Sequence, residues 1–163
     1  MRIPIQVLVH PVRKTLHGWE FLILKRIESR GGFWQGVTGA PENGESLIEA
    51  AKRELFEETG YKLVTLTQTG KFYVIPMEDR WKDIYPKNTT EIPEYLFIAK
   101  IDDLGPPNID PIEHDDWKWC SYEDAMKYLS LDDNKKALKY VQKCLENDVN
   151  KEMKENSTNF KFF

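Results

Sequence analysis

The sequence has few cysteines, few histidines and no long apolar run, and each scarcity excludes a class of protein. Among its 163 residues there are two cysteines and three histidines, and none has the paired spacing of a zinc site or a disulfide framework. We therefore expect Cys120 and Cys144 to be reduced packing residues. No apolar stretch approaches the length of a membrane span or a secretory signal, so we expect a cytoplasmic protein that does not bind membranes.

An excess of positive charge is also missing, because 27 acidic residues outnumber 23 basic ones. Nucleic-acid backbones are held chiefly by Lys and Arg, so we expect no nucleic-acid partner. A small phosphorylated ligand remains compatible, since a bound metal ion reverses the local sign of the charge. Without an internal repeat or a Gly/Ser-rich linker, the chain is expected to form one domain over residues 1–150, followed by a polar tail over 151–163. The tail is expected to be mobile or to dock by its closing aromatics, and monomer and homodimer both remain open.

Apolar periodicity and turn residues predict a mixed α/β fold with a strand-rich sheet, one central helix and two C-terminal helices. The first two strands are expected to form a hairpin-like pair around the polar segment 14–18. A polar and aromatic stretch over 76–93 is expected to be a long loop, and long loops within a domain are usually functional. The predicted strands are 3–9, 20–25, 33–38, 62–75, 94–101 and 117–120, and the predicted helices begin at Ser46, at Ser121 and at Asn134, the last running to 146.

The central helix is the best-marked element. Ser46 with Glu49 three residues later forms a capping box, and Gly60 is a natural stop for the helix. Within it, Glu54, Glu57 and Glu58 stand at i, i+3 and i+4, which places all three carboxylates on one face. Like charges at this spacing repel unless a cation lies among them, and hard oxygen ligands favour magnesium, manganese or calcium. The alternative is a solvated acidic face.

The residues around these carboxylates favour the metal site. Gly39, five residues, Glu45, seven residues and Arg53-Glu54-Leu55-Phe56-Glu57-Glu58-Thr59-Gly60 resemble the Nudix box, Gly-x5-Glu-x7-Arg-Glu-U-x-Glu-Glu-x-Gly-U, in which U is bulky and aliphatic. Every fixed position matches, and only Tyr61 departs, in the final U place. The resemblance implies an α/β/α sandwich with a mixed sheet, in which the box forms a loop, a helix and a second loop.

The same resemblance implies roles for the box residues in a pyrophosphate-cleaving hydrolase. Magnesium, or manganese as a substitute, would be held by Glu54, Glu57, Glu58 and the carbonyl of Gly39, while Arg53 and Glu45 would hold the geometry and Gly60 would let the chain turn away. Glu54 is the first candidate for the base that accepts a proton from water. Glu113 is the second candidate and a further metal ligand, because Glu113-His114 precedes a tryptophan-bearing strand as in many Nudix enzymes. The alternative for Glu113 is an exposed loop acid, and His114 is as well explained by structure as by ligand contact.

Outside the box, the run from Phe33 to Gly39 and Asn134 at the late helix resemble the bacterial dihydroneopterin triphosphate pyrophosphatase subgroup, which also acts on deoxynucleoside triphosphates such as dATP. The products would be a monophosphate and pyrophosphate. ADP-ribose or diadenosine polyphosphate hydrolysis, and a non-catalytic nucleotide-binding module, are the alternatives. Ordinary packing is the alternative for each aromatic of the expected substrate pocket, which comprises Lys25 and Arg26 for phosphates and Phe33, Trp34, Gln35, Trp81 and Tyr85 for a flat ring.

Overall fold

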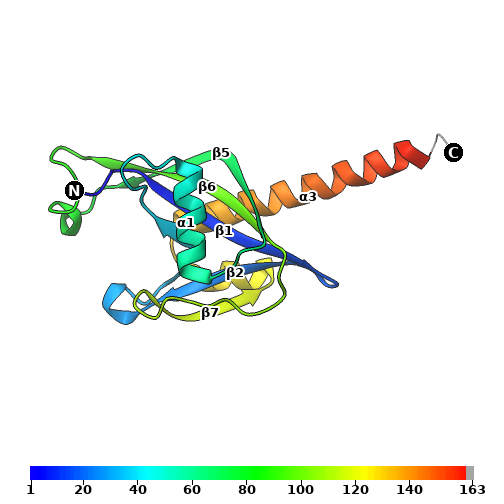
Figure 1. The fold of residues 1–163 in the computed structure, drawn as a ribbon, viewed down its shortest axis with the longest axis horizontal. Helices are drawn as coiled ribbons and strands as arrows, with labels where there is room; N and C mark the ends of the chain where they lie inside the picture. Colours follow the sequence, from blue (N-terminus) through cyan, green and yellow to red (C-terminus); the bar gives the residue numbers. More distant parts are fainter. Residues whose placement is uncertain (161–163) are drawn as a thin grey trace.

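The computed structural model describes the backbone of residues 1–160 and the side chains of residues 1–148. Seven strands form one mixed sheet with helices on both faces (Figure 1), which confirms the predicted α/β class. The strands are β1 (Gln6–Thr15), β2 (Gly18–Arg26), β3 (Trp34–Gln35), β4 (Val37–Gly39), β5 (Val64–Pro76), β6 (Glu91–Ile101) and β7 (His114–Cys120).

The sheet is mixed because β1 lies between partners of opposite direction. It pairs antiparallel with β2 through the predicted hairpin, with Val12 opposite Phe21, and parallel with β6. The strand order is β3-β2-β1-β6-β5, with β4 beside β1 and β7 beside β2. The parallel register places Gln6 opposite Glu94, so the ends of β1 and β6 bring two polar side chains to one edge of the sheet.

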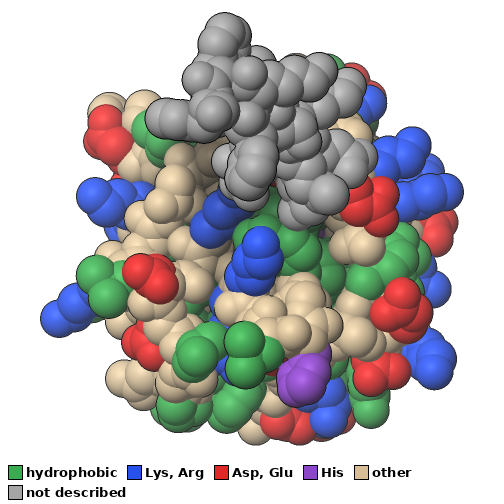
Figure 2. Space-filling view, turned by 90° about the vertical axis from the view of Figure 1, so that its right-hand side faces the viewer, with side chains coloured by type: hydrophobic (Ala, Val, Ile, Leu, Met, Phe, Trp, Pro, Cys, Tyr) green, Lys and Arg blue, Asp and Glu red, His purple; other side chains and the backbone are tan. Residues whose placement is uncertain are grey.

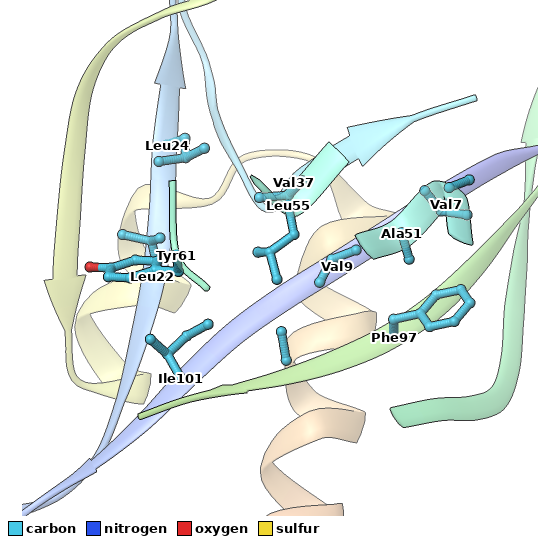
Figure 3. Packing of buried hydrophobic residues seen from close by; sticks show 12 residues of the cluster. Val7, Val9, Leu22, Leu24, Val37, Ala51, Leu55, Tyr61, Phe97 and Ile101 are labelled. Carbon is cyan, nitrogen blue, oxygen red and sulfur yellow. The ribbon is translucent and has the colours of Figure 1, made fainter. Parts of the chain in front are cut away.

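Alternation along β1 supplies the two halves of the core. Val7 and Val9 pack toward α1 (Leu47–Thr59), as Figure 3 shows, whereas Leu8 and Val12 pack toward α2 (Tyr122–Tyr128) and α3 (Asp132–Phe160). Successive strand residues point to opposite faces, so one strand supports both layers. The arrangement is the predicted α/β/α sandwich.

Helix α1 begins and ends as its sequence predicts. The Ser46 hydroxyl accepts a hydrogen bond from the backbone N–H of Glu49 at 3.2 Å. Gly60 has a φ of 72°, the left-handed conformation that favours glycine, and its N–H donates to the carbonyl of Phe56. Ala51 and Leu55 are buried and Glu58 is buried beside them, whereas Glu57 is about half exposed.

Several boundaries differ from the prediction. Strand β1 covers Gln6–Thr15 rather than 3–9, and β7 begins at His114 rather than at residue 117. The segment 33–38 is two strands rather than one, because Gly36 separates β3, which pairs with β2, from β4, which pairs with β1. Strands β5 and β6 stay paired as far as Pro76 opposite Glu91, which shortens the predicted long loop to residues 77–90 and leaves η2 (Asp79–Trp81) within it.

The last helix does not end at residue 146. It continues to Phe160, since no Gly or Pro interrupts residues 134–160. The expected tail is therefore helical over 151–160. Its side chains and residues 161–163, on which the predicted aromatic docking depends, lie outside the described part of the chain.

The two ends of the molecule differ. The N-terminus, the loop 77–90 and η1 (Glu28–Arg30) lie together at the left in Figure 1. The opposite end, apart from its grey residues, carries acidic, basic and apolar side chains intermixed (Figure 2). Within the described residues, no helix has both the length and the apolar character needed to cross a membrane.

Candidate active site

Arg53 of α1 is the centre of an ion-pair network that joins this helix to the loop before it. Its guanidinium donates to both carboxylate oxygens of Glu45, at 2.8 and 2.9 Å, and to the Ala40 carbonyl at 3.0 Å. It also donates to Glu54 at 2.9 Å and Glu57 at 3.3 Å. The hydrogen bonds from Arg53 lower the pKa of Glu45 to about 2. One rigid donor fork therefore joins the box loop to two of the predicted metal ligands.

Glu54 lies against the box loop, and this contact explains the need for glycine at position 39. A Cβ added to Gly39 would collide with the Glu54 carboxyl group. Only 15% of the Glu54 side chain is exposed, and burial raises its pKa. Glu57 is about half exposed on the same helix face. The two carboxylates therefore meet different surroundings, one enclosed by the loop and one open to solvent.

A second acidic group forms where α1 meets the start of β7. Ligand atoms of Glu58, Glu113 and His114 all lie within 4.8 Å of one another. Glu58 is buried, and burial together with the neighbouring Glu113 carboxyl raises its pKa well above the ordinary value. Burial also lowers the pKa of His114 to about 4. Among the described residues, Glu58 Oε2 and both ring nitrogens of His114 have no hydrogen-bond partner.

These residues fit a divalent cation. Unpaired buried polar atoms are costly, and carboxylates that crowd together repel. An oxygen-ligated cation would satisfy Glu58 Oε2 and offset the repulsion between Glu58 and Glu113. Sequence pattern leaves the role of His114 open, and the fold places this side chain beside both carboxylates.

A cleft of about 470 Å³ opens beside these carboxylates. Glu54 and Glu113 line it together with the box loop, and so do four arginines, Arg2, Arg26, Arg30 and Arg53. Arg30 lies 3.5 Å from the Glu113 carboxylate. The cleft thus combines acidic groups suited to a cation with guanidinium groups suited to phosphate oxygens.

A second cavity of about 380 Å³ continues from the first, because Arg2, Arg26, Arg30 and Thr38 line both. Its apolar walls include Phe33, Trp81 and Tyr85. The rings of Trp81 and Tyr85 are 6.3 Å apart and nearly perpendicular. Its size and aromatic lining suit a flat heterocycle. Ring pocket and carboxylates are therefore joined by a bridge of arginines.

Two predicted substrate residues do not lie in either cavity. Lys25 is 3.7 Å from Glu28 and 4.0 Å from Asp115, on the face of β2 opposite to Arg26. Trp34 packs against Tyr128 with ring centroids 5.5 Å apart. Strand alternation separates Lys25 from its neighbour Arg26, so one of the adjacent cations reaches the cleft and the other does not. Gln35, by contrast, lines the ring pocket.

Several residues that line the two cavities were not among the site residues predicted from the sequence. Arg2 and Arg30 come from the N-terminal segment and a turn, where single charges are common. The position of Glu94 can be predicted from the sequence. It lies two residues from both Ile92 and Leu96, so all three side chains point to the same buried face of β6. Asn134, which the sequence placed at the late helix, accepts a hydrogen bond from the backbone N–H of Gly36 at 2.9 Å and ties α3 to the strands below.

This geometry agrees with the comparison to known families. The chain belongs to the NUDIX domain family, whose model matches residues 5–144. An RNA pyrophosphohydrolase of Bartonella clarridgeiae is 33% identical over 100 residues, which cover 56% of this chain and 58% of that protein. A dihydroneopterin triphosphate diphosphatase of Haemophilus influenzae is 30% identical over 114 residues, with 66% and 69% covered. Thus the family's named relatives include pyrophosphohydrolases.

Coverage of the relatives is partial. The chain spans 28% of an octanoyltransferase of Myxococcus xanthus, to which it is 35% identical over 113 residues, or 66% of this chain. It spans little more than half of the Bartonella proteins. Among solved structures, a NUDIX hydrolase of Listeria monocytogenes superposes with a TM-score of 0.77 at 32% identity, covering 90% of this chain and 97% of that one. The Escherichia coli dihydroneopterin triphosphate pyrophosphohydrolase has the same fold, with a TM-score of 0.73 at 24% identity and coverages of 85% and 94%.

Proposed function

We propose that this protein is a magnesium-dependent hydrolase that cleaves a nucleoside triphosphate or a pterin triphosphate to a monophosphate and pyrophosphate, with manganese as a substitute ion. One observation carries the proposal. The aromatic cavity and the carboxylate cleft share Arg2, Arg26 and Arg30, so a ring, a chain of phosphates and a cation have adjoining places in that order.

The residues divide the work by position. The cation would be held by the Gly39 carbonyl and by four carboxylates, those of Glu54, Glu57, Glu58 and Glu113. We infer that these residues belong to one domain over residues 1–150. Nudix hydrolases generally use divalent metal ions, which neutralise phosphate oxygens and activate water. The three arginines would neutralise the remaining phosphate charge.

A carboxylate at the cleft would take the proton from the attacking water. Glu54 is our first candidate, because it lines the cleft and is held in place by both Arg53 and the Gly39 loop. Glu113 is the second, since it also lines the cleft but is held by the single contact with Arg30. Arg53 also lines the cleft, but its guanidinium is engaged by Glu45, Glu54 and Glu57, so we assign it the role of positioning the carboxylates.

The names of the relatives support a triphosphate-like substrate, and they include both RNA and a free pterin triphosphate. We favour the free small molecule, because the ring pocket is a cavity of limited volume and the chain has a net charge of −4.

The test is a product assay of purified protein with magnesium. It offers dihydroneopterin triphosphate, the deoxynucleoside triphosphates, 5′-triphosphorylated RNA, ADP-ribose and diadenosine tetraphosphate in parallel. Release of pyrophosphate from a free triphosphate supports the proposal. Faster turnover of RNA, ADP-ribose or the dinucleotide contradicts the substrate class, and no turnover of any substrate contradicts the assignment as an enzyme.

A further inference from the structure

Two carboxyl groups meet at the polar side of the ring pocket, and neither belongs to the predicted catalytic set. Glu94 comes from β6 and Asp133 from the first turn of α3, and both line the cavity. Glu94 is only 1% exposed. Its Oε2 accepts a hydrogen bond from the side chain of Gln6, while its Oε1 has no partner among the described residues. A buried carboxyl with a vacant oxygen beside a second acid costs stability unless a ligand uses it.

Glu94 carries a proton near neutral pH. Burial and the adjacent Asp133 carboxyl raise its pKa to about 9. Even with this proton, the four carboxyl oxygens of Glu94 and Asp133 offer a ligand more hydrogen-bond acceptor sites than donors.

Three side-chain amides that line the cavity are engaged by neighbouring groups. The amide of Gln6 donates to Glu94, and the amide of Gln35 lies 3.5 Å from the Thr38 hydroxyl. Asn134 lies 3.4 Å from Asp133 with its amide nitrogen and accepts from Gly36 with its oxygen. The carboxyl oxygens of Glu94 and Asp133 thus line the same cavity as the rings of Phe33, Trp81 and Tyr85 and can accept hydrogen bonds there.

We propose that Glu94 and Asp133 determine ring specificity by accepting two adjacent N–H groups, and so select the 2-amino-4-oxopyrimidine ring that guanine and pterins share. That ring edge places a ring N–H beside an amino group, and a carboxylate can accept from both. Adenine and cytosine place an unprotonated ring nitrogen beside the amino group. This nitrogen would face a carboxylate oxygen with no proton between the two acceptors. The inference rests on the proposed function, because the ring reaches this pair only if its phosphates lie along the arginines.

The test measures equilibrium binding by calorimetry in EDTA, where metal-dependent hydrolysis does not interfere. The probes are dGTP, dITP, which lacks the 2-amino group, 7-deaza-dGTP, which differs at the opposite side of the ring, and dATP. We expect equal affinity for dGTP and 7-deaza-dGTP, and about 10- to 100-fold weaker binding of dITP and dATP, the range for one hydrogen bond to a charged group. Equal affinity for dGTP and dITP, or tightest binding of dATP, would overturn the proposal.

Variants locate the discrimination. Asp133→Asn replaces one of the two acceptor oxygens with a donor amide and should bring the affinity for dGTP down to that for dITP. Glu94→Gln keeps a neutral group that both accepts and donates, and should preserve the preference. The matched control is Asp132→Asn, an exposed neighbour that does not line this cavity. If Asp133→Asn leaves the ratio of affinities unchanged while circular dichroism shows a folded protein, the pair does not read the ring.

The outcomes separate this inference from the proposed function. Selective binding of dGTP in EDTA without hydrolysis in magnesium defeats the proposed function alone. Pyrophosphate release with equal binding of all rings defeats the inference alone. Adding dihydroneopterin triphosphate to the binding series then tells a pterin site from a guanine site, since both share the edge and differ beyond it.

Discussion

The two ends of the cleft are built in different ways. At the carboxylate end, Glu54, Glu57 and Glu58 come from little more than one turn of α1, and Arg53 of the same helix holds two of them. The ring pocket instead takes its side chains from the strands β1 to β6, from η1, from the loop 77–90 and from α3. A site on one helix keeps its geometry when surrounding segments change, whereas a pocket shared among many segments changes with each of them. The comparison indicates that this fold can keep its chemistry and alter its substrate.

The largest effect should come from the carboxylate end. Glu57→Gln removes one proposed metal ligand from a half-exposed position, so the fold should remain while turnover falls by at least about 100-fold. Steady-state kinetics with saturating magnesium measures the change. Glu49→Gln, an exposed acid of the same helix, is the control and should retain activity. Turnover near that of the wild type in Glu57→Gln would contradict the metal assignment.

The next prediction concerns the residue that orders this end. Arg53→Lys keeps the charge but cannot contact Glu45, Glu54 and Glu57 together, so kcat/KM should fall by roughly 10- to 100-fold and the magnesium concentration for half-maximal rate should rise. A magnesium titration of activity separates this from simple unfolding. Lys52→Arg at the adjacent exposed position should change neither quantity. An unchanged magnesium dependence in Arg53→Lys would show that the network does not position ligands.

Between the two ends, the arginine bridge should affect binding more than chemistry. Arg30→Ala removes a half-exposed cation that lines both cavities, and KM should rise about 10-fold with a smaller change in kcat. Lys25→Ala is the informative partner, because Lys25 lies outside both cavities and its loss should leave KM unchanged. A larger effect of Lys25→Ala than of Arg30→Ala would place the phosphates elsewhere.

The smallest effect is expected in the ring pocket, on stability. The folded protein holds the Glu94 proton up to a pKa of about 9, above the ordinary 4.5, so this contribution to stability is present at low pH and is lost as pH rises between these values. Glu94→Gln removes that loss. Its melting temperature should exceed that of the wild type at pH 8 by at least ~2–4 °C, which corresponds to ~1 kcal/mol, and should approach it near pH 5. A difference independent of pH would refute the buried proton.

The contrast between the carboxylate end and the ring pocket also explains which features of the fold and the site can be predicted from the sequence. The capped helix and its carboxylates depend on spacings of three and four residues, so Ser46, Glu54 and Gly60 could be assigned from local pattern alone. The mixed α/β class also followed from periodicity, whereas the α/β/α layers were implied by the resemblance to the Nudix box. The end of α3 did not, because nothing in a polar helix of good helix formers marks where it stops.

The substrate pocket depended on long-range register, which local pattern does not specify. Lys25 and Arg26 are adjacent in sequence, yet strand alternation sends only Arg26 into the cleft. Trp34 and Trp81 are alike as residues, but the first packs under Tyr128 and the second lines the cavity. Glu94 and Asp133 are brought together only by the parallel pairing of β1 with β6 and by the position of α3.

The most direct test of the continuous cleft is a crystal structure with manganese and a non-hydrolysable α,β-imido analogue of dGTP. The account predicts anomalous manganese density at the carboxylates of Glu54, Glu57 and Glu58, phosphates along Arg2, Arg26 and Arg30, and the ring beside Trp81. Manganese bound away from these carboxylates, or a ring outside the pocket lined by Trp81, would contradict it.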